Sequence, residues 1–201
     1  MSSKDPPEVI ELVEAIESLL PKAIELDGVI VRSAGTKYAN EDDFLSGEGS
    51  GRFGGRWNPI GLKAIYGSTD IITATIEANQ NFIDAGFSLS SLRPRVTAGA
   101  HVTVEKLLDL TDASIRRKLG FSKAELVEED WMAIQRGGEE SWTQAIGRGC
   151  FEMGFEGLIA PSARNPDGNN VVLFPEVIPA GKIVILGQDE LPPHPDNWPA
   201  K

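Results

Sequence analysis

A glycine-rich stretch, residues 47–61, constrains this chain more than any other part of its sequence. It reads GEGSGRFGGRWNPIG and places six glycines in fifteen residues. Glycine at that density indicates a backbone that turns through positive φ or passes close to another group. Arg52 and Arg56 stand within the stretch, and a guanidinium held there can present a planar set of donors to a phosphate or a carboxylate. We therefore expect the stretch to bind an anion.

The segment that follows adds an aromatic ring and a carboxylate. Residues 64–67 have the composition of a short strand and carry Tyr66. A helix is predicted from about Asp70 to Phe82, and it carries Glu77. Arginines, a tyrosine and a carboxylate on a rigid element, all within about thirty residues, are typical of a nucleotide-binding site.

The predicted helix has two distinct faces. Ile72, Ile76 and Ile83 make one apolar stripe. Glu77 lies on another face, which it shares with small or polar residues: Thr73, Ala74 and Asn81. Such neighbours leave room for a ligand over the carboxylate. The alternative for a lone helix glutamate is a solvated surface position.

The glycine stretch also matches the dinucleotide-binding fingerprint, at Gly49, Gly51 and Gly54. That fingerprint requires a strand before it and a helix opening at its end. Here an acidic run, residues 41–43, precedes the match, and Asn58 with the proline after it cannot open a helix in that register. The Rossmann interpretation is therefore rejected, and no Walker-type motif occurs.

Five positions together resemble the RES domain family, which is named for an arginine, a glutamate and a serine. The resemblance covers roughly residues 28–186 and is carried by Arg32 at the end of a short strand, Arg56 in GGRWNPIG, Tyr66 in IYGS, Glu77, and Ser162 in APSAR. Family members are typically toxins of bacterial toxin–antitoxin pairs that consume NAD. The resemblance implies a fold related to the ADP-ribosyltransferases.

The family implies a role for each matching residue. Glu77, Arg32 and Tyr66 are predicted to be catalytic, with Glu77 stabilising positive charge that develops on the ribose and Tyr66 giving a platform for nicotinamide. Arg32 and Arg56 are predicted to clamp the diphosphate of NAD. The remaining candidates for contact with NAD are Ser162, through a hydrogen bond, and more weakly Arg52 and Asn170. Trp57 is expected in the core, and Asn170 is read as a turn residue.

The implied activity is cleavage of the bond between nicotinamide and ribose. The residues do not select the acceptor, but the resemblance favours water, which would make the protein an NAD glycohydrolase, or inorganic phosphate, which would make it an NAD phosphorylase. A mono-ADP-ribosyltransferase, with a protein side chain as acceptor, is the alternative. A nucleotide-binding or interaction module without catalysis is the alternative of another class. NAD is then the substrate, no prosthetic group or metal is expected, and the resemblance implies a cognate antitoxin as partner.

Composition agrees with a cytoplasmic protein. The 41% hydrophobic content is ordinary, no apolar run approaches the roughly 20 residues of a membrane helix, and residues 1–8 do not resemble a secretory leader. The one cysteine, Cys150, cannot form an internal disulfide and, with only His101 and His194, makes no metal cluster. A net charge of −11 argues against nucleic acid or an anionic membrane as partner.

Strands and helices alternate without a repeating unit, which predicts one α+β domain with a mixed or antiparallel sheet and helices around it. The expected organisation is an N-terminal helical segment over residues 1–27, a catalytic domain over 28–187 and an extended tail over 188–201. Strands are expected at 28–33, 64–67, 95–104, 157–160, 170–174 and 182–186. Helices are expected at 8–20, 70–82, 112–120, 122–135 and 141–153, and residues 35–50 and 106–110 are expected to be connections.

Overall fold

The computed structural model describes residues 6–84 and 94–198, with the side chains of residues 80–84 outside the description. Placements predicted for Asn81 and Ile83 therefore lie outside the described side chains. The helices are α1 (Pro7–Glu17), α2 (Glu48–Phe53), α3 (Ile71–Asp84), α4 (Ala113–Lys118), α5 (Lys123–Glu128), α6 (Trp131–Arg136) and α7 (Trp142–Glu152). The strands are β1 (Ile24–Gly35), β2 (Ile65–Ser68), β3 (Arg95–Asp109), β4 (Gly157–Pro161), β5 (Asn169–Leu173) and β6 (Ile183–Ile185).

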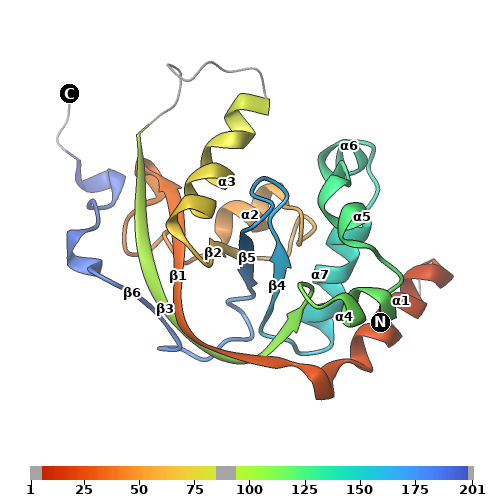
Figure 1. The fold of residues 1–201 in the computed structure, drawn as a ribbon. Helices are drawn as coiled ribbons and strands as arrows, with labels where there is room; N and C mark the ends of the chain where they lie inside the picture. Colours follow the sequence, from red (N-terminus) through yellow and green to blue (C-terminus); the bar gives the residue numbers. More distant parts are fainter. Residues whose placement is uncertain (1–5, 85–93, 199–201) are drawn as a thin grey trace.

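Five strands close into a ring. Their order is β1–β2–β5–β4–β3, and β3 pairs again with β1, while β6 adds to the other edge of β3. The long side of the ring is the antiparallel pair β1 and β3, from Ile24 opposite Leu107 to Gly35 opposite Arg95 (Figure 1). β3 and β4 run parallel, and the other described pairs are antiparallel. The sheet is therefore mixed.

Apolar residues alternate with other residues along the strands, and this alternation gives the ring a buried apolar face. β3 places every second residue on one face, as a pleated strand must, and the residues of that face are apolar. They pack with the facing residues of β1, β2 and β5 into one buried cluster: Ile30, Ile65, Ala100, Val102, Val104, Leu107, Val171 and Leu173. β1 and β3 are both longer than predicted, and residues 106–109, expected as a connection, belong to β3. Because β1 and β3 pair with each other, each strand continues past the apolar segment from which it was predicted.

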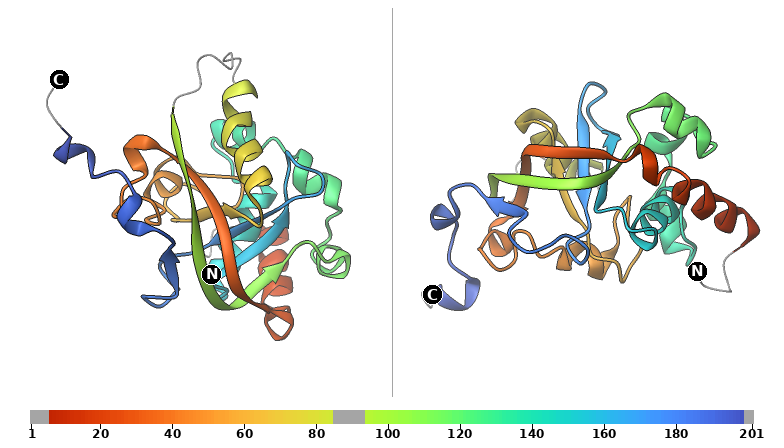
Figure 2. Two further views of the ribbon diagram at one scale, coloured as in Figure 1. Left: turned by 60° about the vertical axis from the view of Figure 1, so that its left-hand side comes forward. Right: turned by 90° about the horizontal axis from the view of Figure 1, so that it is seen from below.

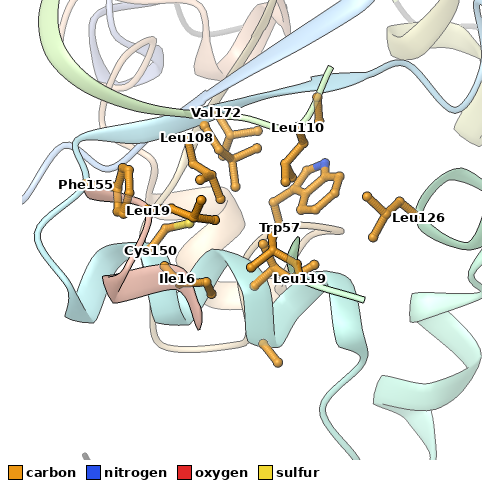
Figure 3. Close-up of a cluster of buried hydrophobic side chains, with 14 of the residues drawn as sticks. Ile16, Leu19, Trp57, Leu108, Leu110, Leu119, Leu126, Cys150, Phe155 and Val172 are labelled. Carbon is orange, nitrogen blue, oxygen red and sulfur yellow. The ribbon is translucent and has the colours of Figure 1, made fainter. Parts of the chain in front are cut away.

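A second core lies between the ring and the helices α1 and α7. Figure 3 shows Trp57 of the glycine stretch lying among Leu110, Leu119 and Leu126, and Trp57 is 2% exposed, as expected of a core residue. α7 passes directly over the backbone of Trp57, because a Cβ on Gly147 would lie 1.7 Å from the Trp57 carbonyl oxygen. The helix thus presses the glycine stretch against the sheet.

The helices α1 and α4–α7 gather on one side of the molecule, and the segment after β6 lies on the other (Figure 2). α7 begins with a capping box in which Ser141 and Gln144 exchange hydrogen bonds. Residues 35–50, predicted as a connection, hold a short 3₁₀ helix at Thr36–Tyr38 and the start of α2. Residues 195–197 form a 3₁₀ turn within the predicted tail.

The prediction of one helix over residues 122–135 is wrong, because the chain forms α5 and α6 with a break at Glu129. The Glu129 carboxylate accepts hydrogen bonds from the backbone N–H groups of Trp142 and Thr143, at 2.8 and 2.9 Å, so it caps α7 instead of continuing α5. Asp130 then caps α6 by accepting from the N–H of Ala133. Side-chain capping therefore divides a segment whose composition suits one helix.

The first turn of α3 packs through its small residues and leaves Ile72 of the apolar stripe exposed. Ile72 is 66% exposed, whereas Thr73 is fully buried and Ala74 is 4% exposed. α3 lies over β1 and β2 with its small-residue face inward. The reason is the close approach of the turn between β4 and β5, where a Cβ on Gly168 would lie 2.1 Å from Thr73 Oγ1. Glu77, one turn along from Thr73, therefore points toward the sheet.

The expectation of an α+β chain with a mixed sheet and surrounding helices is confirmed. Within the described residues, no helix combines the length and the apolar character needed to cross a bilayer.

Candidate active site

The glycine stretch turns through positive φ, as predicted. Gly47, Gly54 and Gly61 have φ of 69°, 73° and 100°, a region that glycine enters without steric cost. Between the first two lies α2, a helix of six residues that the sequence did not predict. The stretch is thus a short helix bounded by two glycines with positive φ, followed by the turn that carries Arg56 and Trp57.

Asn58 and Ser50 hold this stretch to β2. Asn58 is fully buried, and its Nδ2 donates to the Ser50 and Leu62 carbonyl oxygens at 3.0 and 2.7 Å. Ser50 Oγ donates to the Ala64 carbonyl oxygen at 2.6 Å and accepts from the Ala64 N–H at 2.8 Å. These bonds give the glycine-rich backbone a single position.

Tyr66 belongs to the same network. Its hydroxyl donates to Asn58 Oδ1 at 2.6 Å and accepts from the Trp57 N–H at 2.9 Å. Burial raises the pKa of this phenol well above its usual value. A Cβ on Gly55 would lie 2.4 Å from the hydroxyl oxygen, so only glycine fits there. Tyr66 therefore keeps its proton, and its hydroxyl positions the glycine stretch.

Glu77 receives two hydrogen bonds at one carboxylate oxygen. Ser162 Oγ donates to Oε1 at 2.5 Å, and Asn170 Nδ2 donates to the same oxygen at 2.7 Å. Asn170 Oδ1 in turn accepts from Ser68 Oγ at 2.8 Å. Among the described residues, Oε2 has no donor. The carboxylate is thus held in place through Oε1, and Oε2 is left to contact a ligand.

Ser162 is fully committed to protein partners. It is 3% exposed, and besides donating to Glu77 it accepts from the N–H groups of Arg164 and Asn165 at 3.0 and 2.9 Å. It therefore shapes the turn after β4 and orients Glu77. Asn170 lies inside β5, so its interpretation as a turn residue is wrong.

The turn between β4 and β5 is tied to the start of α3. Asn165 Nδ2 donates to Thr73 Oγ1 at 2.8 Å. Thr73 Oγ1 donates to Asp70 Oδ2 at 2.6 Å, and the Thr73 N–H donates to Asp70 Oδ1 at 2.8 Å. Ser162 and Glu77 thus lie on two elements that are joined by a second set of hydrogen bonds.

Arg32 joins three segments. Its Nε donates to the Phe44 carbonyl oxygen at 2.8 Å, and its Nη1 donates to the Tyr66 carbonyl oxygen at 2.7 Å. Its guanidinium also lies over the Phe44 ring. Burial, followed by the nearby charge of Arg95, lowers the pKa of Arg32 to about 10. Arg32 is therefore still a cation at neutral pH.

Arg56 spans the glycine stretch and the end of α5. Its Nη1 donates to the carbonyl oxygens of Leu126 and Glu129 at 2.9 and 3.1 Å. Burial lowers its pKa, although the carboxylates of Glu129 and Glu77 act in the opposite direction. Arg52 is exposed and lies over the Phe53 ring, 5.2 Å from its centroid. Arg56 is fixed, whereas Arg52 is on the surface.

These residues surround a cavity of about 780 Å³, which we call the main cavity. That volume is in the range of small-molecule sites. A smaller annex of about 180 Å³ lies under α3. The main cavity and the annex share five of their lining residues: Arg32, Ser33, Tyr66, Glu77 and Asn170. α2, α3 and the turn between β4 and β5 gather at this end of the molecule (Figure 1).

The main cavity brings together all seven predicted site residues except Ser162, which acts behind Glu77. Sequence reasoning missed Arg95 and did not assign Arg164, and both line the main cavity. Five arginines and three carboxylates (Asp43, Glu48, Glu77) face it. A protein of net charge −11 therefore has a locally cationic cavity.

The sequence is similar to those of known proteins. The RES domain family model matches residues 29–194. The chain is 30% identical over 128 residues to the NAD(+) phosphorylase MbcT of Mycobacterium tuberculosis, which is 60% of this chain and 62% of that protein. It is 28% identical over 152 residues to Toxin Res of Photorhabdus laumondii, which is 73% of this chain and 81% of that protein.

A solved structure also matches, that of the M. tuberculosis MbcT–MbcA toxin–antitoxin complex, with a TM-score of 0.71 and 25% identity over 88% of this chain and 89% of the matched chain. The predicted ADP-ribosyltransferase-like fold is confirmed by that match. The sequence match to MbcT spans less than two thirds of that relative's length. Since the family model matches most of the chain, this protein belongs to the RES domain family.

Proposed function

We propose that this protein binds NAD in the main cavity and breaks the bond between nicotinamide and ribose. The observation that carries the proposal is the carboxylate of Glu77, held by Ser162 and Asn170 at the junction of the main cavity and the annex. The names of its relatives support it: one is an NAD(+) phosphorylase and another a toxin.

The cavity suits the charge of NAD. Its diphosphate carries two negative charges, and the repulsion from an acidic protein is screened within about 8–10 Å at physiological salt. Contacts within the cavity then decide binding, and Arg56 can donate its remaining N–H groups to a phosphate. Arg32, which faces both the annex and the main cavity, is placed at the ribose end.

Cleavage of the nicotinamide–ribose bond requires a group that stabilises positive charge on the ribose more than it requires an acid. Nicotinamide leaves as a neutral molecule, so its departure requires no proton. The ribose passes through an oxocarbenium-like transition state, as in other glycosidic cleavages. A carboxylate fixed before the reaction stabilises that charge without reorganising. Glu77 is held in this way through Oε1, and Oε2 faces the ribose. The ring of Tyr66 lines both spaces and gives the flat surface for nicotinamide.

We further propose that an antitoxin restrains this activity, in keeping with the toxin–antitoxin complex among its structural matches. Two exposed aromatic residues, Tyr38 and Phe53, line the main cavity, and they offer a partner contact area beside the site. Aromatic side chains contribute large contact areas at protein interfaces. A segment laid over α2 and residues 36–46 closes the entrance to the main cavity.

The test is incubation of the purified protein with NAD, with and without inorganic phosphate, while nicotinamide release is measured. We expect release from the wild type and its loss in Glu77→Gln. Release with ADP-ribose attached to a protein identifies a transferase. That result leaves the cleavage intact and changes only the acceptor. Binding of NAD without any release identifies a binding module and contradicts the proposal.

A further inference from the structure

Trp131 is a tryptophan of the main cavity that has no partner within the protein. It is the first residue of α6, is half-buried and lines the main cavity but not the annex. Two exposed tryptophans do have partners, since Trp142 packs against the ring of Phe121 and the indole N–H of Trp198 donates to the Pro193 carbonyl oxygen. Within residues 6–84 and 94–198, the indole of Trp131 makes neither a ring contact nor a hydrogen bond. Because buried tryptophans usually pair their N–H and pack their rings, this indole is available to a ligand.

Trp131 does not anchor α6 in a core. All six residues of α6 are described, and none of them is buried. Polar contacts hold the helix on both sides of Trp131. Before it, the Glu129 carbonyl oxygen accepts from Arg56 at 3.1 Å. After it, Gln135 Nε2 donates to the Phe53 carbonyl oxygen at 3.0 Å. The indole is thus placed beside the glycine stretch by bonds in which it takes no part.

The main cavity extends from α3 to α6. Glu77 lines it from α3 and Trp131 from α6, and Arg56 and Arg164 line it as well. Figure 1 shows α3 and α6 on opposite sides of the turn between β4 and β5, which carries Arg164. Trp131 is close to Arg56, because Glu129, two residues earlier in the chain, accepts a hydrogen bond from it. The cavity therefore presents a carboxylate, then cations, then an indole.

The parts of NAD follow the same order. Nicotinamide and its ribose come first, the diphosphate follows, and the second ribose carries adenine at the other end. With the first ribose at Glu77 and the diphosphate at Arg56, as proposed above, adenine lies beyond Arg56 on the side away from α3. Trp131 is on that wall of the main cavity. A base stacks on an aromatic side chain through its flat face, and an indole gives a large, rigid surface for such a contact.

Two other aromatic residues line the main cavity, and both are less suited to stacking. Tyr38 and Phe53 are each more than half exposed. Lys37 lies over the Tyr38 ring at 5.6 Å, and Arg52 lies over the Phe53 ring at 5.2 Å. A base that stacks on either ring must displace the cation or use the opposite face. Trp131 has no such contact among the described residues.

We propose that Trp131 stacks on the adenine ring of NAD and holds the adenosine end of the substrate. This inference rests on the NAD cleavage proposed above, and it assigns a binding residue that the sequence did not indicate. Trp131 does not touch the reacting atoms. Its contact with adenine is the same before the reaction and in the transition state, so it should lower the KM for NAD and leave kcat unchanged.

The experiment compares two probes that differ by adenosine. ADP carries adenine, ribose and a diphosphate, whereas inorganic diphosphate lacks the adenosine. Calorimetry measures the affinity for each probe in the wild type, Trp131→Ala and Trp131→Phe, and the phenylalanine variant keeps a ring should the alanine variant not fold. The matched control is Trp198→Ala, which removes an exposed tryptophan that does not line the main cavity. Circular dichroism reports folding.

We expect Trp131→Ala to bind ADP roughly tenfold or more weakly, the loss typical of one stacked base, and to bind inorganic diphosphate within about twofold of the wild type. Its KM for NAD should rise by a similar factor with little change in kcat. Trp131→Phe should keep most of the affinity for ADP. ADP should quench the tryptophan fluorescence of the wild type, and Trp131→Phe should lose most of that quenching while it still binds ADP. Trp198→Ala should match the wild type in affinity and kinetics.

Four results would overturn the inference. The first is a wild type that does not bind ADP, and the second is unchanged ADP affinity in Trp131→Ala. The third is an equal loss of affinity for ADP and for inorganic diphosphate, which means that the substitution disturbs Arg56 and removes no stack. The fourth is a lowered kcat with an unchanged KM for NAD, which places Trp131 at the reacting end. A protein that binds ADP through Trp131 but releases no nicotinamide from NAD contradicts the proposed function instead.

Discussion

Ser162 donates its hydroxyl hydrogen to Oε1 of Glu77 over 2.5 Å, although 85 residues separate the two in the chain. The serine is buried and has no capacity left for a ligand. The glutamate and the serine that carry the resemblance to the RES family thus meet in one hydrogen bond, and the serine orients the glutamate. Contacts among β4, α3 and β5 thus fix the position of the Glu77 carboxylate.

Replacement of Glu77 by glutamine should reduce the rate of NAD cleavage by on the order of 10²–10³-fold, the loss typical when one preorganised electrostatic group is removed. The amide oxygen of glutamine can still accept from Ser162 and Asn170, so thermal unfolding should stay near that of the wild type. Measured nicotinamide release and a melting curve decide this. Full activity in a folded variant would exclude the role of Glu77.

Ser162→Ala should lower kcat by tenfold or more with little change in the KM for NAD, because the serine positions Glu77 and does not touch the ligand. Ser162→Thr keeps the hydroxyl and should recover part of the rate. Steady-state kinetics on both variants make the test. A KM effect with unchanged kcat would instead place the serine hydroxyl on NAD.

Arg56→Lys should weaken NAD use although it keeps the charge, because an ammonium cannot donate to two backbone carbonyls and a phosphate with the geometry of a guanidinium. Arg56→Ala should weaken it further and also lower the free energy of unfolding by about 1–3 kcal/mol, since the Leu126 and Glu129 carbonyls lose their donor. Kinetics and urea unfolding measure the two effects. Wild-type efficiency in both variants would make Arg56 purely structural.

Gly147→Ala should destabilise the protein, against the usual gain of about 0.5–1 kcal/mol for this change inside a helix. The new Cβ would lie 1.7 Å from the Trp57 carbonyl oxygen, which cannot move without the glycine stretch. Gly149→Ala in the same helix meets a flexible side-chain end, Ile16 Cδ1, at 2.8 Å, and serves as the milder control. Equal melting temperatures for the two variants would contradict the packing described for α7.

Stability should fall at alkaline pH through Cys150. Burial raises the pKa of its thiol well above the value of about 8.5 in an unfolded chain. The unfolded state therefore releases the proton first, and the free energy of unfolding decreases as pH rises above about 8.5. Urea unfolding at pH 7.5 and 9.5 should show a larger loss for the wild type than for Cys150→Val. Thiol reagents should label Cys150 only after unfolding.

The sequence predicts the site where its residues lie close together in the chain. Arg56, Tyr66 and Glu77 fall within one segment whose glycines and spacing indicate a ligand site, and the structure brings them to one cavity. Arg95 could not be predicted as a site residue, because an arginine at the start of a strand has no neighbouring sequence pattern that indicates a ligand site. It reaches the site through pairing of Gly35 with Arg95 across β1 and β3, and register between distant strands depends on tertiary contacts.

The packing face of α3 could not be predicted from the sequence for a related reason. Three isoleucines at helical spacing outweigh a threonine and an alanine in any count of hydrophobicity, yet Ile72 is exposed and Thr73 is buried. The turn between β4 and β5 comes so close to α3 that only small side chains fit, and Asn165 bonds to Thr73 there. Steric fit to a distant turn decided which face packs, and periodicity alone does not contain that information.

β1 and β2 close the strand ring through one residue pair, Val31 with Ser68, whereas β1 and β3 pair along almost their whole length. Amide hydrogens of β2 that face β1 should therefore exchange with solvent through local opening, while those at the centre of β3 wait for global unfolding. The guanidinium of Arg32, bonded to the Tyr66 carbonyl, crosses this weak junction. The main cavity thus borders the part of the strand ring that is expected to open first, and an anion bound at Arg32 should slow this local opening.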